Sequence, residues 1–241
     1  MSAVSAQARV EVALTLRRGE SLLLTLGIPV LLLVVFGLVD VLPTGTDDPV
    51  DFLAPGVLAL AVMSTAMVGL GIATGFERSY LVLKRLGATP LGRPALVGAK
   101  IASVLVVEAL QLAVLVPIAY LIGWRPPLAG WPLAIAAMAL GTVAFAGIGL
   151  TMAGVLRGEV NLAAQNGCYL VLLLFGGIVF PLAELPAPLE AAAKVLPSSA
   201  LAELVRTALT DPVSTSGWAW AVLAAWAVAA PLVAARTFRW W

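Results

Sequence analysis

Six long apolar runs dominate the sequence, and each is long enough to cross a lipid bilayer as a helix. An α-helix needs about 20 apolar residues to cross about 30 Å of hydrocarbon. The runs are continuous and rich in Leu, Ala and Val, whereas barrel strands show short segments of alternating polarity. The sequence therefore predicts an all-α integral membrane protein, a single transmembrane domain over residues 1–241. The six predicted spans cover about residues 22–42, 52–75, 94–122, 131–156, 162–182 and 218–235.

The composition excludes most other classes of protein. Apolar residues make up 61% of the chain and charged residues only 11%, far from the average of soluble domains. The chain has no His, which excludes His-based triads and the commonest zinc and haem ligand sets. The single Cys168 cannot form an internal disulfide, and the net charge of +1 does not indicate a nucleic-acid partner. We therefore expect a mechanical or permeative function, with no metal or cofactor bound by this chain.

The distribution of Lys and Arg predicts the orientation of the spans. With six spans, eleven of the fourteen basic residues fall on one side, and Arg125, Lys194 and Arg206 fall on the other. Cytoplasmic loops carry the excess of basic residues in membrane proteins. Both termini are therefore predicted to be cytoplasmic, and the Asp-rich loop over residues 44–51 to be external.

Residues 1–20 are predicted to form a helix that lies in the cytoplasmic interface of the membrane. Gln7, Glu11, Thr15 and Arg18 recur at helical spacing, with apolar residues on another face. A helix of this kind keeps its basic residues near lipid phosphates. The alternative is a basic leader that only sets the orientation.

Residues 76–93, between the second and third spans, are predicted to form a short amphipathic cytoplasmic helix. The segment has four basic residues, one acid and an apolar set at helical spacing, and Gly87 is a plausible helix end. Such helices suit docking into a groove on a soluble partner. The alternative is an ordinary basic loop whose helix rests on lipid. The candidate contact residues are Glu77, Arg78, Tyr80, Leu83, Lys84, Arg85 and Leu86.

The external segment over residues 183–212 is too apolar for a plain loop. Several prolines divide it, and residues 201–209 have an amphipathic helical pattern that Ser199 could cap. We expect two short re-entrant helices, which dip into the outer leaflet or lie on it. Non-spanning structure survives in a membrane only where protein or a water-filled cavity covers its polar groups.

Two groups of polar residues are candidates for a substrate path. Glu108 lies near the middle of the third span, where an ionised side chain is costly, and Gln111 shares its helical face. These residues are either a polar spot on the path or a structural hydrogen-bonding pair. A second group at the start of the fifth span either lines an inner entrance or anchors the helix end. That group consists of Asn161, Gln165, Asn166 and Tyr169.

These segments resemble the permease subunit of type 2 ABC exporters over nearly the whole chain. The run from Glu77 to Leu91 is similar to the coupling segment of that family, although residues 79–82 are Ser-Tyr-Leu-Val where the family commonly has an acid followed by Gly-Thr. The stretch from Leu196-Pro197 to Leu209 is similar to the tail region of the family. The start of the chain, from Arg17 to Gly37, is similar as well.

The resemblance implies a separate ATP-binding cassette ATPase, with ATP and Mg bound by that partner. The sequence lacks the phosphate-binding loop G-x-x-x-x-G-K-[ST], so the chain is not expected to be an enzyme by itself. A second permease, either identical or related, would complete the transport unit in the bilayer. The family also implies efflux of drug-, antibiotic- or lipid-like molecules across a bacterial plasma membrane by alternating access, as in multidrug resistance.

Two other functions fit the same residues. One is a membrane assembly or regulatory protein that has this fold but does not transport. The other is a proton-coupled secondary transporter that uses Glu108. The coupling-type loop disfavours the second alternative.

Overall fold

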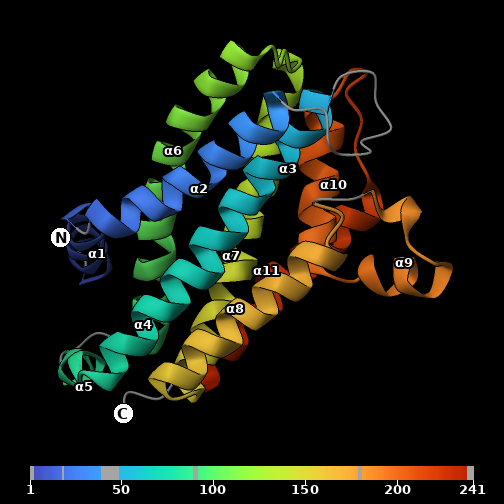
Figure 1. The fold of residues 1–241 in the computed structure, drawn as a ribbon. Coiled ribbons are helices and arrows are strands. Elements are labelled where there is room, and N and C mark those ends of the chain that lie inside the picture. The colour runs from blue at the N-terminus through green and yellow to red at the C-terminus, as the bar shows by residue number, and fades with distance from the viewer. Residues whose placement is uncertain (1–2, 18, 39–48, 89–91, 179–180, 238–241) are drawn as a thin grey trace.

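The computed structural model describes residues 3–17, 19–38, 49–88, 92–178 and 181–237, which are helical almost throughout (Figure 1). No strand occurs in these ranges. The α-helices, in chain order, are α1 (Ala3–Arg17), α2 (Gly19–Leu38), α3 (Pro49–Met63), α4 (Leu70–Ser79), α5 (Val82–Gly87), α6 (Arg93–Ile122), α7 (Trp131–Val155), α8 (Gly158–Phe175), α9 (Ala187–Ala193), α10 (Pro197–Leu209) and α11 (Gly217–Thr237). A π-helix, η1 (Ser64–Gly69), joins α3 to α4, and η2 (Leu128–Gly130) and η3 (Leu182–Glu184) are short 3-10 helices.

The prediction of an all-α membrane protein is confirmed. Within the described residues, four helical runs are long and apolar enough to cross a bilayer: Val50–Ser79, Pro94–Ile122, Leu128–Val155 and Gly217–Thr237. They correspond to the second, third, fourth and sixth predicted spans. Parts of other predictions lie outside the described residues, namely 39–42 of the first span, 44–48 of the external loop, 89–91 of the coupling segment and 179–180 of the fifth span.

Helix α7 is the centre of the bundle. It packs along α11 and also contacts α3, α4, α6, α8 and α10. Inside a membrane such contacts depend on close packing, because lipid tails are as apolar as the side chains they replace. Small residues on α7 permit the approach: a Cβ on Gly147 would lie 2.5 Å from the backbone nitrogen of Pro231, and one on Gly149 would lie 2.5 Å from the Met67 carbonyl.

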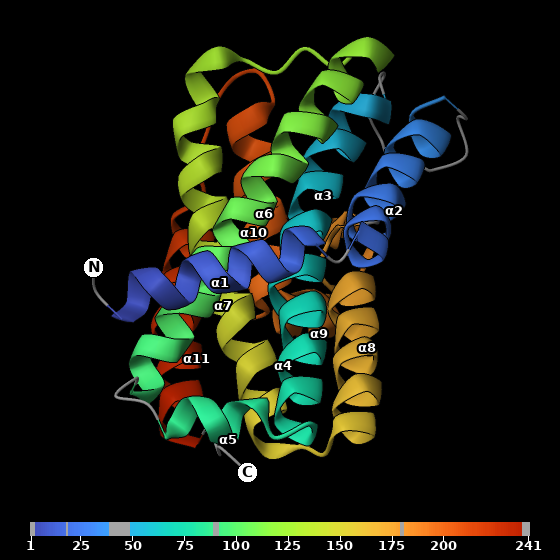
Figure 2. The ribbon, with the colours of Figure 1, turned by 90° about the vertical axis from the view of Figure 1, so that its left-hand side faces the viewer.

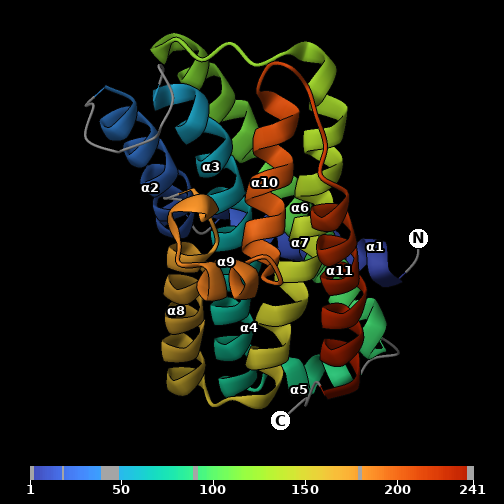
Figure 3. The same ribbon diagram turned by 90° about the vertical axis from the view of Figure 1, so that its right-hand side faces the viewer.

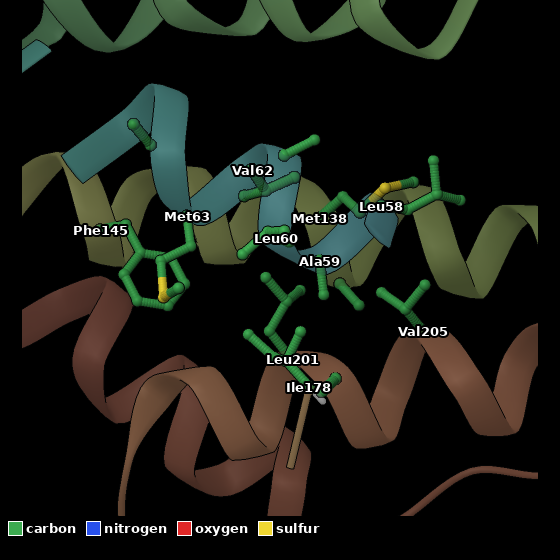
Figure 4. Close-up of a cluster of buried hydrophobic side chains, with 14 of the residues drawn as sticks. Leu58, Ala59, Leu60, Val62, Met63, Met138, Phe145, Ile178, Leu201 and Val205 are labelled. Atoms are coloured by element: carbon green, nitrogen blue, oxygen red, sulfur yellow. The ribbon is translucent and has the colours of Figure 1, made fainter. Parts of the chain in front are cut away.

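A cluster of buried apolar side chains joins α3, α7 and α10 (Figure 4). After the exposed Asp51, helix α3 is buried on every side, which explains why residues 52–63 are apolar and show no amphipathic pattern. The labelled members of the cluster are Leu58, Ala59, Leu60, Val62, Met63, Met138, Phe145, Ile178, Leu201 and Val205.

Helix α8 is shorter than the fifth predicted span, and the hairpin that follows it packs into the bundle. Helix α8 ends at Phe175, part of the way along the bundle, and α9 lies at the level where α8 ends (Figure 3). The chain turns at Gly177, whose φ of +63° is a left-handed conformation that favours glycine. Helix α10 then continues through the opposite half of the bundle, with its apolar face buried. Of the two expected arrangements, the buried apolar face of α10 favours a helix that enters the bundle over one that lies on the surface.

Helix α1 lies crosswise over α6 (Figure 2). The predicted N-terminal helix is thus present, and its one buried charged residue, Glu11, faces the bundle. Because α1 packs against α6, it is part of the folded body rather than a separate leader.

Candidate functional site

The predicted coupling segment is divided differently from the expectation. The helical run that contains α3 and α4 continues to Ser79, so Glu77 and Arg78 end this long run instead of starting the coupling helix. Leu81 has a positive φ of +60° and connects α4 to α5. The coupling helix itself is only α5, Val82–Gly87, which ends at the predicted Gly87. The predicted helix over 76–93 is wrong in its start because a left-handed turn at a leucine leaves no signal in the apolar spacing.

Helix α5 has one inner and one outer side. Leu83 is fully buried against Leu96 of α6, and Leu86 packs beside them. Tyr80 lies before the helix, is 73% exposed and stacks on Phe76, so it does not share an apolar face with the two leucines as predicted. Lys84 and Arg85 are exposed as well. The outward surface of this end of the bundle therefore consists of Tyr80, Leu81, Val82, Lys84 and Arg85, which we call the α5 surface.

Glu77 belongs to a buried ion triad that the sequence analysis missed. Lys100 Nζ lies 2.7 Å from Glu77 Oε2 and 3.1 Å from Glu11 Oε1, and the lysine side chain is 1% exposed. Gln7 Nε2 donates to the same Glu11 oxygen at 2.9 Å. The triad ties α1, α4 and α6 together. The available signal was Lys100 itself, because a lysine seven residues into an apolar helix requires a partner.

Arg78 also serves the fold of this chain. Its Nη1 donates to the carbonyl oxygens of Ala153 at 3.3 Å and Leu156 at 3.1 Å. These carbonyls lie at the end of α7, where helical partners are missing. Arg78 therefore caps α7 from the neighbouring helix α4.

Glu108 is buried between α6 and α7. Thr142 Oγ1 contacts both Glu108 Oε2 and the Met138 carbonyl. The Thr142 hydroxyl has one proton, which it can donate to the Glu108 carboxyl or share with the Met138 carbonyl. The adjoining cavity, lined in part by Gln111, measures about 20 Å³, which is room for about one water molecule.

Gln111 joins three helices. Its Nε2 donates to the Thr25 carbonyl of α2 at 3.0 Å, and its Oε1 accepts from Thr65 of η1 at 3.0 Å. Both bonds lie beside the π-helix, an irregularity that often marks a functional position. Glu108 and Gln111 thus lie together, as predicted, in a closely packed polar spot.

The four polar residues predicted as one group on α8 differ in burial. Asn161 and Gln165 are fully buried, whereas Asn166 is exposed and bonds back to the Leu162 carbonyl. Tyr169 is half-buried and packs against the apolar core. Neither Asn166 nor Tyr169 lines the cavity beside Glu108.

The two buried amides hold α8 against α4 and α7. Asn161 Nδ2 donates to the Gly71 carbonyl at 3.0 Å, and Gln165 Nε2 donates to the Gly149 carbonyl at 2.9 Å. A Cβ on Gly71 would lie 2.0 Å from Gln165 Nε2, and one on Gly75 would lie 2.3 Å from Asn161 Nδ2. The two glycines therefore make room for side-chain amides that bond to backbone carbonyls.

The fold and these contacts define an all-helical, multi-pass membrane protein with a short cationic helix projecting from one end of the bundle. A family model described as ABC-2 type transporter matches residues 3–210. The chain belongs to the ABC-2 type transporter family: it is the membrane permease subunit of an ABC transporter, a transport component that is not itself catalytic and that works with an ATP-binding cassette ATPase. Comparison with curated proteins found no match.

Proposed function

We propose that this permease is one half of an ATP-driven exporter in a bacterial plasma membrane. In this proposal the chain has six spans, including α2 and α8, and both termini are cytoplasmic. It pairs with a second permease, identical or related, and moves a drug-, antibiotic- or lipid-like molecule by alternating access. ATP and Mg are bound by the partner ATPase. Membership of the ABC-2 family supports the transport role, and the direction and the cargo class rest on the resemblance of the sequence to exporters.

The observation that carries the proposal is the attachment of the α5 surface to the bundle. Helix α5 is anchored through Leu83 against α6, and it follows α4 after a tight turn at Leu81. Glu77, three residues before Tyr80, is held by Lys100 of α6. A displacement of α5 by an ATPase would therefore move α4 and α6 together, because the turn at Leu81 joins α5 to α4 and the buried contact of Leu83 joins it to α6.

Charge reversal on the α5 surface tests this proposal. Lys84→Glu combined with Arg85→Glu removes two exposed cations without touching Leu83 or the ion triad. We expect the double variant to lose co-purification with the ATPase and to lose ATP-dependent transport in vesicles. Arg157→Glu is the matched control, because Arg157 is an exposed cation in the short connection between α7 and α8 on the same proposed side.

Two results would contradict the proposal. If no ATPase co-purifies with the wild-type chain, the exporter function fails and the assembly or regulatory alternative takes its place. If the ATPase binds the Lys84/Arg85 double variant as well as it binds the control, the α5 surface is not the contact. Transport measured with a labelled compound then separates a transporter from a non-transporting protein.

For Glu108 and Gln111 we propose a structural role rather than a place on the substrate path. The support is that their hydrogen-bond partners Thr142, Thr25 and Thr65 belong to this chain and that the adjoining cavity is small. This role also disfavours a proton-coupled secondary transporter, which would need a path for water to the carboxyl. Transport that persists unchanged in Glu108→Gln is the expected result.

A further inference from the structure

A pocket of about 380 Å³ lies between the short helices that follow α8 and the bundle. Its size is within the range of small-molecule sites in proteins. The lining elements α9, α10 and α11 lie on the side of the molecule seen in Figure 3. Charged, aromatic and apolar side chains all contribute to it. The lining residues used below are Phe52, Glu190, Lys194, Glu203, Arg206 and Trp218.

Arg206 is the most unusual residue of this pocket. Its guanidinium lies over the ring of Phe52, with the Cζ atom 3.9 Å from the ring centre. Its Nη2 donates to the Gly177 carbonyl at 3.1 Å. Its Nε is buried and has no hydrogen-bond partner within the described ranges. A guanidinium has five N–H donors, so most of its bonding capacity remains for another acceptor.

Of the described residues that line the pocket, only one pair of opposite charges is in direct contact. Lys194 and Glu190 form their own ion pair at 2.7 Å. Arg206 and Glu203 lie one helical turn apart on α10, and neither has an ion pair of 4 Å or less within the part of the chain that the structure describes. Burial lowers the pKa of Arg206 to about 10, and Glu203 acts in the opposite direction, so the guanidinium stays charged at neutral pH. The pocket thus offers one cation and one anion a helical turn apart, with no direct ion pair between them within the described residues.

A ligand that matches this arrangement carries an anion for Arg206 and a cation for Glu203. The planar fork of arginine suits the oxygens of a phosphate, and a carboxylate suits an ammonium group. Trp218 begins α11 and has the amphipathic ring that is typical of a membrane interface. We infer that this pocket binds the head group of an aminophospholipid from the outer leaflet, with the phosphodiester at Arg206 and the ammonium at Glu203. The outer-leaflet assignment rests on the topology proposed above, which puts α9 and α10 in the external half of the membrane.

Lipid binding to purified protein in detergent tests this inference. Native mass spectrometry would compare phosphatidylethanolamine with phosphatidylglycerol, which has the same phosphodiester but no ammonium. We expect wild type to prefer phosphatidylethanolamine at least fivefold, Glu203→Gln to lose that preference, and Arg206→Gln to bind both lipids at least tenfold more weakly. Arg125→Gln is the matched control because Arg125 also lies over a ring, that of Tyr120, and bonds to carbonyls, but is exposed and outside the pocket.

Several outcomes would overturn the inference. Equal lipid binding by Arg206→Gln and Arg125→Gln removes the phosphate site. If Arg206→Gln does not fold, the Glu203→Gln variant is sufficient as a test. A preference for phosphatidylethanolamine that is unchanged in Glu203→Gln would overturn the inference. Competition by soluble glycerophosphoethanolamine at the same concentration as the lipid would assign the site to a free phosphoester instead.

The side of the membrane is tested separately from the pocket. In a Cys168→Ser background, the exposed Ser214→Cys, in the connection from α10 to α11, should react with a membrane-impermeant maleimide added to intact cells. Reaction only after the cells are opened would overturn the outer-leaflet assignment and the proposed topology, while binding at Arg206 in detergent would still stand. A failure of the topology and a failure of the head-group site are thus distinguishable.

Discussion

Replacing Lys100 by methionine is expected to destabilise the permease by about 3–5 kcal/mol, because removal of one partner leaves buried charge uncompensated. The size follows from the geometry of the triad. The Glu11 and Glu77 oxygens both lie within 3.1 Å of Lys100 Nζ, so they are no more than about 6 Å apart. At an effective dielectric constant of about 20, two unit charges at that distance repel by about 3 kcal/mol.

Thermal unfolding in detergent, followed by the fluorescence of the seven tryptophans, measures this effect. A loss of this size corresponds to a fall in Tm of about 10 °C for a chain of this length. Glu11→Gln with Glu77→Gln in the Lys100→Met background should restore at least half of the loss, because the repulsion is then gone. Lys194→Met is the matched control: it removes a half-exposed ion pair and should change stability by less than about 1 kcal/mol. A fall in Tm of less than 2 °C for Lys100→Met, or no recovery in the triple variant, would refute the reasoning.

Two further substitutions test the polar contacts inside the bundle. Gly71→Ala places a Cβ 2.0 Å from Gln165 Nε2 and should destabilise the protein by about 1–3 kcal/mol. The control Gly167→Ala, whose Cβ would have nothing within 4 Å, should be neutral or stabilise the protein by up to about 1 kcal/mol. Equal melting temperatures of the two variants would contradict the amide contact. Glu108→Gln should keep the wild-type Tm because the amide oxygen can still accept from Thr142, whereas Thr142→Val should lower stability by about 1–3 kcal/mol. A larger loss in Glu108→Gln would show that the carboxyl is needed.

The fold class was predictable because apolar runs have a direct physical cause. A helix that crosses hydrocarbon must be predominantly apolar over about 20 residues, and α6, α7 and α11 are. The end of α8 could not be predicted in the same way. The apolar run continues past Phe175 because Gly176, Gly177 and Ile178, at the turn that follows α8, are themselves buried. Apolarity reports burial in general, and it does not separate lipid from the interior of the protein.

The candidate site was predictable in place but not in its contacts. A cationic helix between the second and third spans follows from the positive-inside rule, and α5 is there. The roles of Glu77, Arg78 and Lys100 depend on partners more than 20 residues away, which no local pattern contains. The sequence assigns Arg78 and Lys100 to one side of the membrane and Glu77 and Arg78 to a partner contact, although all three are engaged inside the bundle.

At the α5 end of the bundle, one set of charged residues stabilises the fold and another is exposed for binding a partner. Glu77 and Arg78 lie three and two residues before the exposed Tyr80, yet their charges are engaged by Lys100 and by the end of α7. A partner that binds this end of the bundle through electrostatic contacts therefore has the exposed cations Lys84 and Arg85 of α5 available to it. Changes in the ion triad should accordingly appear first as lost stability, and changes on the α5 surface first as lost binding. A variant of Glu77 that weakens ATPase binding without a change in Tm would show that the two tasks are not separate.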